Sequence, residues 1–136
     1  MNIDKVYDKI KENGIKVFPC GIPNTKAVSV ETCNKYGIFI NYEEIENVDD
    51  EFLVVTHEYG HCKTGSTHLP YSPFDIIAKH EYRADRRAVL DFLPVEKNKA
   101  AINDGCCTVH EFSEYLALPE AFIIKAFHHY NAMEWI

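Results

Sequence analysis

The sequence predicts an α+β protein in which a small sheet packs against helices, and three observations support this class. Short apolar runs of strand length, bounded by glycine, proline and asparagine, occur at residues 15–18, 27–31 and 36–40. From residue 47 onwards, apolar residues recur three and four positions apart, which is the spacing of amphipathic helices. The first of these helices is apolar on two opposite sides, which indicates burial between two layers of structure.

Composition and charge are typical of a soluble globular chain. The 136 residues are 46% hydrophobic and 26% charged, and no apolar run approaches the roughly 18 residues of a membrane span. The net charge of −7 argues against nucleic acid as the main partner. The N-terminus lacks the pattern of a signal peptide, so we expect a cytoplasmic protein that binds no membrane. The 5 cysteines are odd in number and form no C-x-x-C pair, which favours reduced thiols over disulfides.

We expect a single domain over residues 1–136 with three consecutive parts. The first part, 1–46, should hold a helix and the small sheet. The second part, 47–93, should hold two long helices, and the third part, 94–136, should be helical throughout. The first helix should span residues 3–13, because its apolar residues fall on one face and a glycine follows them.

The motif H-E-x-x-H occurs once, at residues 57–61. Residues four apart on a helix differ by about 40° around the axis, so His57 and His61 point the same way and can share one metal ion. Glu58 lies about 100° further round, where it can reach a water held by the metal. Two imidazoles suit Zn²⁺, and a catalytic zinc site needs one more protein ligand and an open position. The alternative is a pair of histidines with only a structural role.

The helix that carries this motif should begin after Asn47 or Asp49, either of which can cap it, and run to about Lys63. One side of it is an apolar stripe, and the opposite side carries apolar residues together with the two histidines. We expect the stripe to rest on the sheet and the opposite side to line a site. The stripe consists of Phe52, Val55, Tyr59 and Cys62. In such surroundings the Cys62 thiol should be an unreactive apolar filler rather than a redox switch.

A second long helix should start at Ser72 and Pro73 and end before Pro94. Its inward face is apolar except for Glu81 and Asp85. Burying an unpaired carboxylate is costly, so such groups are paired or bind a metal. Glu81 is therefore the candidate third ligand, and Asp85 should accept the spare N–H of a zinc-bound histidine. The alternative is a salt bridge between these carboxylates and an arginine or lysine from elsewhere in the chain. The apolar residues of this face are Phe74, Ile77, Ala78, Ala84, Ala88 and Phe92.

These motifs resemble a known group of enzymes. Residues 57–61 (H-E-Y-G-H) followed by 81–85 (E-Y-R-A-D) look like the gluzincin arrangement, H-E-x-x-H and then E-x-x-x-D. Together with residues 37–41 and 81–94, they resemble the ImmA/IrrE family of metallo-endopeptidases. The resemblance covers residues 30–95 well and extends more weakly to the C-terminus. Members of that family are often encoded by phages and integrative elements and act on a repressor partner.

The resemblance implies a zincin-like fold, with the small sheet packed on the H-E-x-x-H helix and on a second, glutamate-bearing helix. It implies Zn²⁺ ligands at His57, His61 and Glu81 and a general base at Glu58. It also implies a protein substrate, a repressor or another transcriptional regulator of a phage or mobile element. Asp85 falls at the last position of the second motif.

The C-terminal part should contain three helices. Residues 94–103 read as a polar helix with proline at its first turn, and Thr108 and Glu111 form a capping box for the next. A last helix should open at Pro119 and face inward with its apolar residues. Two short helices joined by a tight turn can bind DNA, but the second helix carries only one lysine, Lys125. A packing element or a surface for a protein partner is the better interpretation.

The expected reaction is hydrolysis of a peptide bond, with Glu58 moving a proton from water to the leaving amine. A further group usually stabilises the oxyanion, and His68 on the connecting loop is our first candidate, ahead of His80, Tyr82 and His110. The strand at residues 36–41 could be a sheet edge on which an extended substrate adds as a strand. The alternative function is a non-proteolytic regulator that binds a repressor and holds zinc only structurally.

Overall fold

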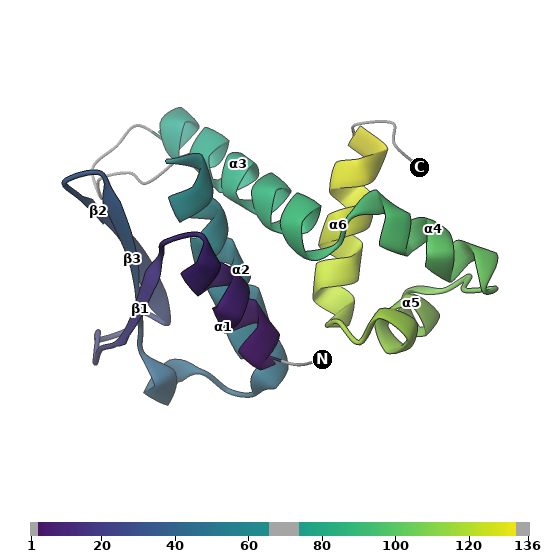
Figure 1. Cartoon of the computed structure of the whole chain (residues 1–136), viewed down its shortest axis with the longest axis horizontal. Helices are drawn as coiled ribbons and strands as arrows, with labels where there is room; N and C mark the ends of the chain where they lie inside the picture. The colour runs from purple at the N-terminus through teal and green to yellow at the C-terminus, as the bar shows by residue number, and fades with distance from the viewer. Residues whose placement is uncertain (1–2, 66–73, 133–136) are drawn as a thin grey trace.

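A computed structural model of the chain describes residues 3–65 and 74–132. Figure 1 shows the sheet and α4–α6 at opposite ends of the molecule, with α3 joining them. The fold is α+β, as predicted. The elements in order are α1 (Ile3–Glu12), β1 (Lys16–Pro19), β2 (Ala27–Thr32), β3 (Lys35–Ile40), a 3-10 turn η1 (Tyr42–Glu44), α2 (Val48–Thr64), α3 (Phe74–Phe92), α4 (Val95–Asn103), α5 (Val109–Leu116) and α6 (Glu120–Ala132).

The sheet has the strand order β1-β3-β2, with β3 parallel to β1 and antiparallel to β2. The expectation that the strand at residues 36–41 forms a sheet edge is therefore wrong, because β3 is paired on both sides. β3 carries Ile38 and Ile40, which are fully buried, and the most apolar strand gains most from the central position. Among the described residues, β2 is paired on one side only and is the edge strand that lies against α2.

Helix α2 begins as predicted, with the Asn47 side chain accepting a hydrogen bond from the backbone of Asp50, and ends at Gly65 in the left-handed conformation. The predicted apolar stripe is buried, but only part of it faces the sheet. The Cys62 thiol lies 4.0 Å from the Gly37 carbonyl of β3. The rings of Phe52 and Tyr59 instead contact the ring of Phe92 on α3, at centroid distances of 6.1 and 5.1 Å, and Phe52 also contacts Phe122 on α6, at 4.9 Å. The helix thus lies between the sheet and α3, and its stripe serves both neighbours.

Helices α2 and α3 approach one another so closely that only glycine fits at the crossing. A Cβ atom on Gly60 would lie 1.9 Å from the Ala84 carbonyl oxygen and 2.6 Å from its carbonyl carbon. Ala84 is itself fully buried. Glycine costs about 1 kcal/mol relative to alanine within a helix, so its presence here reflects packing rather than helix propensity. The crossing brings the preceding turn of α3, which carries Glu81, beside the histidines of α2.

The inward face of α3 is largely as predicted, with Ala84 and Ala88 buried, although Ala78 is exposed. The predicted start at Ser72 and Pro73 lies outside the described residues. The C-terminal part forms the three expected helices, and the Thr108–Glu111 capping box of α5 is present. Among residues 3–65 and 74–132, no helix combines the length and apolar character that crossing a bilayer requires.

Replacing Gly60 with alanine should destabilise the fold, because the new methyl group would overlap the backbone of Ala84 and push α3 away. We expect a loss of about 3 kcal/mol in the free energy of unfolding, measured by chemical denaturation. Gly21→Ala is the matched control, because a Cβ there meets no atom within 4 Å. A Gly60→Ala variant as stable as the unaltered chain would contradict the close helix crossing.

Candidate metal centre

Three potential ligand side chains converge where α2 meets α3. The Nε2 atoms of His57 and His61 are 3.1 Å apart. The Glu81 carboxylate lies against both, with Oε2 2.7 Å from His57 Nε2 and Oε1 3.0 Å from His61 Nε2. One ligand atom from each of the three residues lies within 4.8 Å of the others. The sequence prediction that these residues come together is therefore confirmed, and the group could hold one metal ion.

Helix geometry and the tight crossing position these three side chains. His57 and His61 are one turn apart on α2, and Glu81 reaches them from α3 because Ala84, one turn further along, packs directly on Gly60. The His61 side chain is 5% exposed and that of Glu81 is 41% exposed. The centre is therefore buried on its α2 side and accessible on the side of Glu81. Two imidazole nitrogens and a carboxylate, with one side accessible, are a donor set that could hold a metal ion and that catalytic zinc sites also use.

Asp85 orients His57. Its Oδ1 atom lies 2.8 Å from His57 Nδ1, as the sequence predicted. A proton on Nδ1 in this hydrogen bond leaves the Nε2 lone pair pointing at the centre, which is the tautomer that a metal requires. Burial alone would raise the pKa of Asp85, but its contacts with His57 and Lys125 lower that pKa overall. The carboxylate is therefore charged and able to hold the imidazole.

The Asp85 carboxylate has a second partner, which the sequence analysis missed. Lys125 Nζ, from α6, donates to the same Oδ1 atom at 3.1 Å. The two interpretations that the sequence left open for Asp85, a histidine partner and a salt bridge, are thus both realised. A signal was present in the sequence, because Lys125 is the only lysine or arginine in residues 119–136. No local sequence pattern, however, indicates that α6 packs against α3.

Glu58 lies beside the ligand group but outside it. Burial raises the pKa of Glu58, although the neighbouring His57 and the side chain and backbone of Ser29 on β2 partly oppose this rise. A carboxylate with a raised pKa is a stronger base than an exposed one, which is a property that general bases need.

A cleft of about 260 Å³ opens over Glu58 and His57. Its walls come from the start of β2, from one side of α2 and from α6. Apolar residues of α2 line it, as predicted, and two lysines line it as well. The residues that line it are Lys26, Ala27, Leu53, Val54, His57, Glu58 and Lys125. The cleft therefore brings a half-buried carboxylate, a histidine of the ligand group and two lysines around one space.

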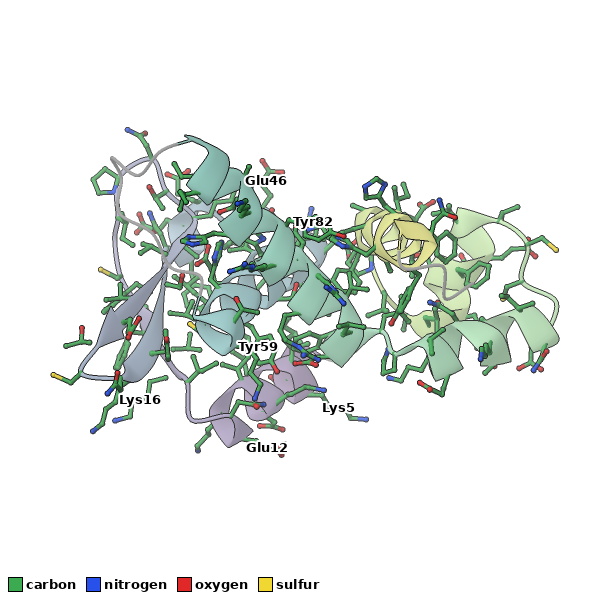
Figure 2. All side chains as sticks on the ribbon, turned by 90° about the horizontal axis from the view of Figure 1, so that it is seen from above. Lys5, Glu12, Lys16, Glu46, Tyr59 and Tyr82 are labelled. Atoms are coloured by element: carbon green, nitrogen blue, oxygen red, sulfur yellow. The ribbon has the colours of Figure 1, made fainter. Side chains whose placement is uncertain are left out.

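Four residues were considered for oxyanion stabilisation, and none of the three that lie in the described ranges lines the cleft. His68, the first candidate, lies outside the described residues. His110 is on α5, where it pairs with Glu114 at 3.1 Å. Tyr82 packs against His129 with ring centroids 4.8 Å apart, and Figure 2 shows it on the side of α3 that faces α6. His80 belongs to α3 and is not among the residues that line this cleft. The role of His68 stays a prediction.

Cys62 is buried, with 4% of its surface exposed, as the stripe predicted. Burial, together with the charge of Glu58, raises the pKa of the thiol to about 12. At neutral pH the thiol is therefore protonated, which suits an apolar filler. Its low reactivity stays a prediction.

Comparison of the chain with protein-family models, with curated proteins and with solved structures gave no match.

Removing any one of the three converging side chains should remove most of the bound metal. We expect about one Zn²⁺ per chain in the purified protein, and at least a tenfold loss of affinity in His57→Ala, His61→Ala and Glu81→Ala. The measurement is metal analysis combined with chelator competition, and chelation should also lower the melting temperature. His110→Ala, at an exposed histidine, is the control. Zinc content unaffected by Glu81→Ala would rule out the third ligand.

Removing the Asp85 carboxylate should weaken the site without abolishing it. Asp85→Ala should lower zinc affinity by about 10–100-fold, because His57 loses the group that holds its tautomer. Asp91→Ala is the matched control on the same helix, since its carboxylate binds Tyr59 and Arg87 and should affect only stability. Complete loss of zinc would make Asp85 a direct ligand, and unchanged affinity would leave it only its ion pair with Lys125.

Proposed function

We propose that this chain is a zinc-dependent endopeptidase of the kind that the ImmA/IrrE resemblance implies, acting on a protein partner. The observation that supports this most is Glu58, a half-buried carboxylate that shares a cleft with His57, one of the three residues of the ligand group. The preferred substrate is a repressor or another transcriptional regulator of a phage or mobile element. That preference rests on the resemblance of the motifs alone.

The chain's own residues suggest how the reaction would run. Bound Zn²⁺ would supply a Lewis acid for the water and the scissile carbonyl. The oxygen of the water forms a bond to the carbonyl carbon while Glu58 takes one of its protons. When the C–N bond breaks, Glu58 gives that proton to the leaving nitrogen, so the products are a carboxylic acid and an amine. His57 is held for its role by Asp85.

An extended segment of the substrate would bind along β2. This strand is paired on one side only among the described residues, and its start, at Lys26 and Ala27, lines the cleft. Ser29 of the same strand is close enough to Glu58 to lower the pKa of its carboxylate, so the base lies beside the strand. A peptide that adds to β2 by main-chain hydrogen bonds would pass over Glu58. β2 replaces the strand at residues 36–41 as the expected docking edge.

A non-proteolytic regulator that binds a repressor, with zinc held structurally, is the second candidate. The exposure of Glu81 argues against it, since structural zinc sites are closed and use four protein ligands. The described residues contribute three candidate ligands. A structural site also has no need of a base such as Glu58 beside the ligands. The proposed enzyme needs both the accessible side at Glu81 and the base Glu58.

Glu58→Gln separates the two functions, because it keeps the shape of the side chain and removes the base. We expect cleavage of a peptide library, followed by mass spectrometry, to fall about 10²–10⁴-fold while zinc content is unchanged. Glu12→Gln, at an exposed residue of α1, is the control and should cleave normally. Cleavage by Glu58→Gln at the rate of the unaltered chain would refute the proposed mechanism, and unchanged biological activity without cleavage would support the regulator.

A further inference from the structure

The cleft over Glu58 is lined in part by a lysine that has no role in the proposed reaction as described above. Lys125 enters the cleft from α6, and 30% of its side chain is exposed. Figure 1 shows α6 beside the C-terminal half of α3, which explains how a residue so far along the chain reaches the centre. Lys125, Glu58 and His57 line the same space from two different helices.

The position of the Lys125 ammonium is set by one hydrogen bond. Asp85 Oδ1 accepts from Lys125 Nζ at 3.1 Å and from His57 Nδ1 at 2.8 Å, so the ammonium lies on the Nδ1 side of His57. A lysine ammonium has three N–H donors, and the bond to Asp85 uses one of them. The flexible four-carbon stem allows the charge to move toward a bound peptide while it stays close to Asp85.

The second lysine of the cleft is held differently. Lys26 Nζ donates to both carboxylate oxygens of Asp50, at 3.0 Å each, and so forms a symmetrical ion pair at the edge of the cleft. Lys125 instead shares a single carboxylate oxygen with His57. Of the two cations, Lys125 is the one whose anchor also holds a residue of the ligand group. A cation near the developing charge stabilises the transition state more than it stabilises the bound substrate.

We propose that Lys125 is a catalytic residue whose ammonium binds the carbonyl oxygen of the scissile peptide bond as negative charge develops on it. The assignment rests on the proposed peptidase function. When water adds to the carbonyl carbon, the π electron pair moves onto the carbonyl oxygen, and the ammonium donates a hydrogen bond to that oxygen. The pair returns when the C–N bond breaks, and Glu58 supplies the proton of the leaving amine. Lys125 keeps all its protons throughout.

The competing interpretation is that Lys125 only ties α6 to α3 through Asp85. The two interpretations predict different changes in metal binding. A structural tie, once removed, would disturb Asp85 and His57 and so weaken zinc affinity together with activity. An electrophilic role predicts a loss of turnover with zinc affinity unchanged or increased, because a positive charge near the centre has been removed.

The test compares Lys125→Met with Lys125→Arg in the zinc-loaded full chain. We expect Lys125→Met to lower kcat about 100-fold with KM changed by less than about threefold. Lys125→Arg should recover much of that loss, since it restores a donor with the same charge. A phosphinic peptide, which imitates the tetrahedral oxygen charge, should bind Lys125→Met about 100-fold more weakly in calorimetry. Lys99→Met, an exposed lysine of α4, removes the same charge and should behave as the unaltered chain.

Three results would overturn the assignment. Unchanged kcat in Lys125→Met would do so, and so would a fall in zinc affinity that matches the fall in kcat. A phosphinic peptide that binds Lys125→Met as tightly as it binds the unaltered chain would also contradict it. These failures differ from failure of the peptidase proposal itself. If Glu58→Gln abolishes cleavage and Lys125→Met does not, only the role of Lys125 is rejected, whereas an unaltered chain that cleaves no peptide rejects both.

Discussion

The close crossing of α2 and α3 at Gly60 is the contact on which the candidate centre depends. The backbone of α3 occupies the space that a side chain at Gly60 would fill, and Ala84 is buried there completely. Because Glu81 is one helical turn before Ala84, any separation of the two helices would carry its carboxylate away from His57 and His61. The position of the third candidate ligand is therefore a consequence of backbone packing. That packing requires a glycine within helix α2.

A row of hydrogen-bonded polar side chains connects the centre to the C-terminal helices. It runs from His57 on α2 through Asp85 on α3 to Lys125 on α6, with both donors on one carboxylate oxygen. A carboxylate in such partly buried surroundings is stable only when its charge is paired, and here the partners come from the two neighbouring helices. Helix α6 is therefore part of the site and not an appended packing element. The aromatic contact between Phe52 and Phe122 holds α6 against α2 from the other side.

Features of the site that depend on one helix could be predicted from the sequence, and those that depend on long-range packing could not. The facing of His57 and His61 follows from helical periodicity, and the approach of Glu81 follows from its place on an apolar face. The central position of β3 was not predictable, since strand order depends on which edges pair across the sheet. The contact of Lys125 with Asp85 was likewise missed, because their separation of 40 positions leaves no local pattern.

The most direct test of this account is X-ray absorption spectroscopy at the zinc edge of the metal-loaded protein. If the centre is built by α2 and α3 as described, the zinc should be bonded only to nitrogen and oxygen, with scattering from about two imidazole rings and distances near 2.0–2.1 Å. The Glu81→Ala variant should keep the imidazole scattering and lose one oxygen. Sulfur at about 2.3 Å would instead mean that cysteines bind the metal, and that result would contradict the central claim.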